Sequence, residues 1–138
     1  MSITVSKVLG YCIDIQDFID SYANSVSIDT IVQEKKEFLR DLGFNTTNYI
    51  SKVKAEDIII LEDGLSGEYS KLIYVLSVVE DSEDDVYKNE QITKVINKHL
   101  SDIRCPKDIR HKLDSVMKIL FNYTGENKII LELVYNEH

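Results

Sequence analysis

The chain has few of the residues on which disulfide-rich, secreted or membrane-spanning proteins depend. Its 138 residues include only two cysteines, Cys12 and Cys105, which are far apart in the sequence. Two thiols cannot form the framework of bridges typical of small secreted domains, so we expect both to be reduced. The longest uninterrupted apolar run spans residues 72–76, whereas a membrane span needs about 20 residues. The start of the chain also lacks a signal-peptide pattern, and we therefore expect a cytoplasmic protein.

Motifs that carry out catalysis or bind calcium are also missing. The segment Gly64–Gly67 contains one serine but lacks the glycine spacing of a nucleophile elbow. The acidic run 81–85 matches the first ligand positions of a calcium loop. However, Val86 stands where that loop needs glycine, and Ile92 stands where it needs a bidentate glutamate.

The residues best suited to zinc are His99, Cys105 and His111. They follow no known ligand spacing, and His99 falls on an apolar stripe, which is typical of a packed histidine. Paired carboxylates such as Glu62 and Asp63 are typical of a solvated surface. We therefore expect no metal, no cofactor and no catalytic residue.

The remaining composition is that of an ordinary globular protein. Hydrophobic residues make up 43% of the chain and charged residues 29%. The length fits a single domain covering residues 1–138, which is large enough to fold without a metal or a disulfide.

The charge is strongly uneven along the chain. The formal net charge is −8, and residues 56–90 carry 11 acidic residues against 2 basic ones. A negative surface repels nucleic acid and anionic membranes, because binding to them relies on Lys and Arg. Acidic patches instead attract basic proteins and accelerate their encounter. The alternative is an acidic face that serves only solubility.

In the first half of the chain, the apolar spacing predicts helices. Residues 4–22 carry apolar side chains every three or four positions, although Gly10 weakens this helix and a strand starting near Ile3 stays possible. A second helix is capped by Ser27 and ends at Gly43. A short helix is expected around residues 49–53.

The second half predicts a hairpin, two helices and a strand. Two β-branched runs around a glycine-bearing loop predict a hairpin near residues 57–79, with the acidic run 80–85 as a loop or helix entrance. Helices follow over residues 92–103 and from Pro106, and alternation over residues 128–135 predicts a strand paired with the hairpin. The expected fold is helix-rich α+β, with about five helices packed on a small antiparallel sheet. The scarcity of glycine and proline leaves an all-α bundle as the alternative.

The candidate binding residues combine carboxylates with tyrosines in and around the acidic middle of the chain. Tyrosine buries a large amphipathic surface and is enriched in interface hot spots. Core packing is the alternative for these rings. The candidate partner-binding residues are Asp57, Glu62, Asp63, Glu68, Tyr69, Glu80, Asp81, Glu83, Asp84, Asp85 and Tyr87.

In size, acidity and lack of catalytic motifs, the whole chain resembles the bacterial immunity proteins encoded beside contact-dependent growth-inhibition toxins. No motif carries the likeness, so no site residue is transferred. The resemblance implies a cytoplasmic protein that neutralises one cognate toxin, often a basic nuclease, as a monomer within a heterocomplex. A small acidic chaperone or adaptor for a secreted effector is the alternative, and a dimer helix with an exposed apolar stripe would distinguish it.

Overall fold

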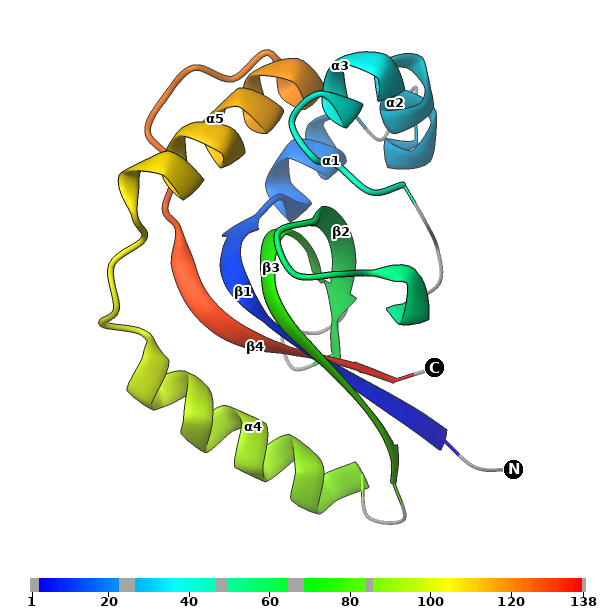
Figure 1. Cartoon of the computed structure of the whole chain (residues 1–138), viewed down its shortest axis with the longest axis vertical. Coiled ribbons are helices and arrows are strands. Elements are labelled where there is room, and N and C mark those ends of the chain that lie inside the picture. The colour runs from blue at the N-terminus through cyan, green and yellow to red at the C-terminus, as the bar shows by residue number, and fades with distance from the viewer. Residues whose placement is uncertain (1–2, 23–26, 47–49, 65–68, 84–85, 138) are drawn as a thin grey trace.

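The fold is α+β, as the sequence predicts (Figure 1). The computed structural model describes residues 3–22, 27–46, 50–64, 69–83 and 86–137. In these ranges it contains five α-helices, one short 3-10 helix and a four-stranded antiparallel sheet. The elements in chain order are β1 (Ile3–Asp14), α1 (Gln16–Tyr22), α2 (Ile28–Glu34), α3 (Lys36–Arg40), η1 (Ile50–Lys52), β2 (Ile58–Asp63), β3 (Tyr69–Glu83), α4 (Val86–Leu100), α5 (Lys107–Phe121) and β4 (Ile130–Glu137).

The strand order in the sheet is β2-β3-β1-β4. The hairpin of β2 and β3 is confirmed, with Ile59 opposite Ile73. The prediction that the C-terminal strand pairs with the hairpin is wrong, because β4 pairs with β1. The sequence did not indicate this arrangement, because the apolar spacing of β1 predicted a helix.

The predicted helix over residues 4–22 is a strand up to Asp14 and a helix only from Gln16. β1 lies between β3 and β4 and is buried on both faces, so both Val8 and Tyr11 are covered. A strand with two buried faces loses the alternation that reveals strands in a sequence. Gly10 fits the strand because a Cβ atom there would overlap the Tyr74 carbonyl and lie 2.7 Å from the Ile73 Cγ2.

The two faces of the sheet carry separate apolar clusters. On the helical face, Tyr11, Ile13, Leu72, Tyr74 and Leu131 pack against α1, α2, α3 and α5, which gather at one end of the sheet in Figure 1. The helix predicted from Pro106 is present as α5, and its apolar stripe of Ile109, Leu113, Val116, Met117 and Leu120 is buried.

The opposite face, here called the inner face, carries a smaller cluster. It contains Val8, Cys12, Ile59, Ile73 and Val134, which pack against the segment around η1. The sheet curls, so that its two outer strands approach each other at one end. There the Asn136 side chain donates a 2.9 Å hydrogen bond to the Glu62 carbonyl.

The helix predicted from Ser27 to Gly43 is divided into α2 and α3 at Lys35. Its predicted ends are confirmed. The Ser27 hydroxyl accepts a hydrogen bond from the Thr30 amide, and Gly43 adopts a φ of +88°. The predicted helix around residues 49–53 is reduced to η1 in the described part of the chain, while Tyr49 lies outside it.

The acidic run 80–85 was expected to form a loop or a helix entrance, but residues 80–83 continue β3, and α4 begins at Val86. They pair with β1 down to the contact between Ile3 and Glu83. Ladder hydrogen bonds to a neighbouring strand outweigh the low β-propensity of these acidic residues.

Helix α4 lies apart from the other helices and runs along the outer edge of β4 (Figure 1). Its Asn97 side chain donates a 3.0 Å hydrogen bond to the Leu133 carbonyl and accepts a 2.6 Å bond from the Leu133 amide. The amide group thereby imitates a neighbouring strand. It covers backbone groups that would otherwise invite edge-to-edge pairing.

We predict that Asn97→Ala lowers the free energy of unfolding by about 1–2 kcal/mol, since two hydrogen bonds are lost while helix propensity improves. Hydrogen exchange at the Leu133 amide should accelerate more than at other β4 amides. Lys98→Ala, at the exposed neighbouring position, is the control and should change stability by less than about 0.5 kcal/mol. Unchanged exchange at Leu133 in Asn97→Ala would show that this contact does not hold α4.

Candidate functional site

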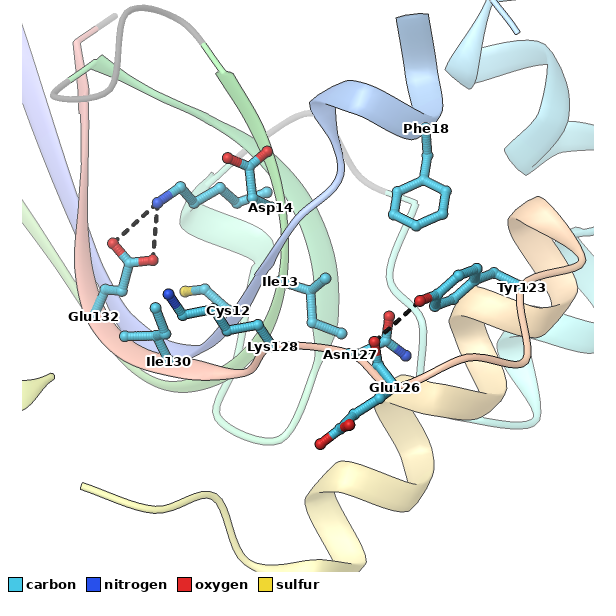
Figure 2. Close-up of a pocket in the computed structure, with 11 residues that line it drawn as sticks. Cys12, Ile13, Asp14, Phe18, Tyr123, Glu126, Asn127, Lys128, Ile130 and Glu132 are labelled. Atoms are coloured by element: carbon cyan, nitrogen blue, oxygen red, sulfur yellow. Dashed lines mark hydrogen bonds and ion pairs between the residues drawn. The ribbon is translucent and has the colours of Figure 1, made fainter. Parts of the chain in front are cut away.

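A hollow of about 330 Å³ opens on the inner face, where β1 leads into α1. Figure 2 shows Glu132, Cys12 and Ile130 on one side of it, and Phe18 and Tyr123 on the other. The two rings meet edge to face with their centroids 4.9 Å apart.

The Lys71 ammonium is the centre of a buried charge cluster in this hollow. It donates to both carboxylate oxygens of Glu132, at 2.8 and 3.0 Å, and lies 3.3 Å from an Asp63 oxygen. Asp63 belongs to β2, Lys71 to β3 and Glu132 to β4. The strands β2 and β4 would stand about 14 Å apart in a flat sheet with two strands between them. One ammonium reaches both carboxylates because the sheet curls toward the inner face.

The pKa of Lys71 is raised. Burial has the largest single effect and lowers this pKa, but the hydrogen bonds and charge of Glu132, together with Asp63, outweigh it. The ammonium therefore stays protonated at neutral pH and does not serve as a general base.

Burial raises the pKa of the neighbouring Cys12 thiol well above its ordinary value, and the Glu132 carboxylate adds to the effect. A protonated, buried thiol is a poor nucleophile. The cluster therefore joins three strands through ion pairs, and the thiol beside it is protonated at neutral pH.

The structure places the predicted binding residues in different environments. The Asp57 carboxylate is held by neighbouring residues, since its Oδ2 accepts hydrogen bonds from the Asn45 side chain and the Lys54 amide. Asp63 is only 2% exposed and belongs to the Lys71 cluster, so its carboxylate is turned away from solvent. Glu62 is exposed at the end of β2.

The other predicted binding residues are located by the backbone alone or not at all. Tyr69 begins β3, Tyr87 lies in the first turn of α4, and Glu80, Asp81 and Glu83 lie in the last part of β3. The side chains of these five are not described, and Glu68, Asp84 and Asp85 lie outside the described residues.

The strand register brings acidic positions of β3 and β4 to one end of the sheet, here called the acidic end. Val5 pairs with Asp81 on one side and with Glu137 on the other, and its neighbour Ser6 pairs with Glu80 and Asn136. Asn136 in turn binds the backbone of Glu62. The acidic end consists of Glu62, Glu80, Asp81, Glu83 and Glu137.

Sequence reasoning missed Glu137 as a member of the acidic end. Glu137 is distant in sequence from the acidic middle of the chain. Only the pairing of β4 with β1 brings the two together. The alternation over residues 128–135 was a signal for the strand, but it gave no information on the neighbouring strand.

Helix α4 exposes several of its apolar residues to solvent. Thr93 is fully buried and Asn97 faces β4, whereas four aliphatic side chains lie in solvent. This apolar flank consists of Ile92 (45% exposed), Val95 (59%), Ile96 (38%) and, just beyond the helix, Ile103 (46%).

A shallower hollow of about 640 Å³ lies between α3 and α5. Phe38 borders it and is 68% exposed, while the Lys35 ammonium donates a 2.6 Å hydrogen bond to the Ile119 carbonyl beside it. The hollow joins two helices of the helical face and is remote in sequence from the acidic end.

Metal binding and membrane insertion find no support in the described part of the chain. No group of His, Cys, Asp or Glu residues there is placed to hold a metal ion, and this includes His99, Cys105 and His111. No described helix combines the length and apolar character needed to cross a bilayer.

We predict that Lys71→Met lowers the free energy of unfolding by about 3–5 kcal/mol, because it leaves the buried Asp63 and the partly buried Glu132 without a cation. Lys128→Met is the matched control, since Lys128 lines the same hollow but is exposed, and should cost less than about 0.5 kcal/mol. Urea unfolding of both variants measures the difference. Equal, small losses would show that the cluster does not hold the strands together.

We also predict a loss of stability at alkaline pH. Cys12 and Lys71 both hold their protons more tightly in the folded chain, because both pKa values are raised. Their contributions are complete below the ordinary pKa values of 9.0 and 10.5 and are lost as pH rises through the folded values. The free energy of unfolding should therefore begin to fall above pH 9.0.

Urea unfolding between neutral pH and pH 10.5 measures this fall. Cys12→Ala should flatten the decline in this range. Cys105→Ala should flatten it less, because the pKa of the half-buried Cys105 is raised less strongly. An identical slope in the parent chain and in Cys12→Ala would contradict the assignment.

The described residues thus offer three features that could serve a function: the hollow with its charge cluster, the acidic end and the apolar flank of α4. The charges of the hollow pair with one another inside the chain. The acidic end and the apolar flank, in contrast, are features that a partner could cover. No protein-family model, no curated protein and no solved structure matches this chain, so the function has to be argued from these features.

Proposed function

We propose that the protein is an immunity-type binding protein, which neutralises a basic protein partner in the cytoplasm through its acidic end. The observation that carries the proposal is the register of β1, which pairs with acidic positions of β3 on one side and of β4 on the other. Residues far apart in the sequence thereby supply one concentrated negative field.

The strand positions around the acidic end offer little opposing charge. Lys7 is the basic residue nearest to it along β1, and Lys71 is buried in its cluster. A concentrated negative field attracts a positive protein surface. Such electrostatic steering can raise the association rate by about 10- to 1,000-fold. Close charge pairs across such an interface couple by about 1.5–7 kcal/mol.

A nuclease toxin domain fits this chemistry because its substrate is polyanionic and its cleft must be basic. Carboxylates of the acidic end would occupy the places where phosphates bind, and so would block the cleft. This mode of inhibition needs a rigid acidic surface but no catalytic residue in the inhibitor.

A second candidate function is that of a small acidic chaperone or adaptor for a secreted effector. The apolar flank of α4 favours it, because an exposed apolar stripe on a helix is the feature that distinguishes this class. The two functions differ in which surface the partner covers, the acidic end or α4.

Coexpression with a basic toxin domain, sought first among the genes beside its own, tests the first proposal. We predict that the chain rescues cells from that protein's toxicity, and that binding weakens steeply with salt. The combined variant Glu80→Lys, Asp81→Lys and Glu83→Lys should slow association by about tenfold or more, because the steering field is reversed.

The matched control reverses three exposed carboxylates of α2, α3 and the turn after them, Glu34→Lys, Glu37→Lys and Asp41→Lys. It makes the same change in net charge but leaves the acidic end intact. Its association rate should stay near that of the parent at physiological salt, where the screening length is about 8 Å. Equal slowing by both variants would assign the effect to net charge and refute a specific acidic site.

A further inference from the structure

The part of β3 that follows Val75 is an open edge of the sheet. β2 pairs with β3 only up to Tyr74, and Val75 makes the last two backbone hydrogen bonds on that side, with Glu56 and Asp57, both at 2.8 Å. The chain before β2 turns at Glu56, whose φ is +75°, instead of following β3 further. Residues 76–83 run past the end of β2 (Figure 1) and pair with β1 on one side, while no strand of the described ranges lies on the other.

The alternation of the ladder decides which backbone groups face this open edge. Val75 directs its amide and carbonyl to the β2 side, so Gly10, which lies opposite, directs its own groups to β4. Val8, two residues earlier in β1, faces β4 as well, and the residue paired with it in β3 therefore faces the open edge. The residues that present their amides and carbonyls to the open edge are thus Val78, Glu80 and Ser82.

An edge of this kind is a template for another extended chain. Unpaired amides and carbonyls along a strand form main-chain hydrogen bonds with an added strand. Two apolar side chains lie on the same stretch, Leu76 with 37% and Val79 with 47% of its surface exposed. One added strand would therefore satisfy the backbone groups and cover apolar surface together.

The charges of the open edge restrict which strand can be added. Residues 76–83 include Glu80, Asp81 and Glu83 but no basic residue. A second copy of the chain paired through the same edge would add three further carboxylates without a counter-charge, and like charges across a strand pair destabilise it. Acidic residues thus discourage self-association at this edge, whereas a segment that carries Lys or Arg is attracted to it.

We infer that the open edge of β3 takes up an extended segment of a basic protein by strand addition, in the antiparallel direction. Antiparallel pairs are the more stable per residue, and β2 already pairs with β3 in this direction. The basic residues of the segment, opposite residues 80–83, then come first in its sequence, and β-branched residues, opposite residues 76–79, follow. The backbone supplies affinity, and the acidic positions select the basic residues.

This inference deepens the proposed function and rests on it for the identity of the partner. Strand addition itself is tested without a toxin, so the two can fail separately. Toxin rescue without protection of the edge amides would leave the inhibitor function intact and refute strand addition. Strand addition by a peptide, without rescue from any toxin, would refute the inhibitor function alone.

Peptide binding followed by NMR tests strand addition on the whole chain. The probe is the end-blocked peptide Lys-Arg-Lys-Arg-Val-Thr-Val-Thr, and two further versions carry N-methyl groups on either its odd or its even amides. An added strand turns only every second amide toward its neighbour. One N-methylated version should therefore bind like the probe, and the other about tenfold more weakly or worse, because its hydrogen bonds are lost.

Hydrogen exchange shows where the peptide lies. The amides of Val78, Glu80 and Ser82 should exchange rapidly in the free chain and several-fold more slowly with the probe bound. The amides of Val79 and Asp81 face β1 and should exchange slowly in both states.

A substitution in β3 tests the same contact from the side of the protein. Ser82→Pro removes one edge amide without changing the charge, and proline is tolerated where a strand amide faces outward. It should weaken binding of the probe several-fold while the far-UV circular dichroism stays that of the parent. Ser82→Ala is the matched control and should bind the probe as the parent does.

Equal binding of the two N-methylated peptides would reduce the contact to charge attraction and overturn strand addition. A probe that does not bind at millimolar concentrations, or that leaves the edge amides unprotected, would overturn it as well. Tighter binding of the peptide with its basic half last would overturn the antiparallel direction.

Discussion

The contact between the Lys71 ammonium and two carboxylates is the interaction on which the shape of this protein depends most. Asp63 comes from one outer strand of the sheet and Glu132 from the other, while Lys71 lies between them on β3. The buried Asp63 and the partly buried Glu132 share one cation, and a single ammonium can reach both only in a curled sheet. The curl encloses the inner face and fixes the distance between the ends of β2 and β4.

The same curl gathers the surface features. It brings the end of β2 to Asn136, so that Glu62 joins the acidic positions of β3 and β4 around the start of β1. It also leaves the outer edge of β4 accessible to α4, whose Asn97 binds Leu133. Because α4 turns its polar side to the sheet edge, its aliphatic side is left in solvent.

The parts of this fold that could be predicted are those whose signals are local. Ser27 and Gly43 mark helix ends through their own backbone chemistry, and the stripe of α5 follows from spacing alone. The predictions that failed concern elements whose structure depends on neighbours distant in sequence. The sequence of β1 predicts a helix because both faces of the strand are buried and its apolar residues do not alternate. The pairing of β4 with β1 cannot be predicted from the sequence of either strand.

The candidate site shows the same division between local and distant information. An excess of carboxylates in the middle of the chain is visible in composition, and several of these positions do meet at one end of the sheet. That Asp63 is buried in an ion pair, or that Glu137 joins the acidic end, depends on strand register. For α4, the spacing of Ile92, Val95 and Ile96 gave no sign of their exposure, because it is the polar side with Thr93 and Asn97 that faces β4.

An NMR titration with the basic protein that the chain is found to neutralise would test most directly whether the acidic end is the partner surface. The amide shifts of the isotope-labelled chain would be followed as that protein is added. We predict that the largest shift changes fall at residues 80–83, at Glu62 and at Glu137, and that they weaken together as salt is raised. Changes confined to α4, or changes that are insensitive to salt, would contradict it.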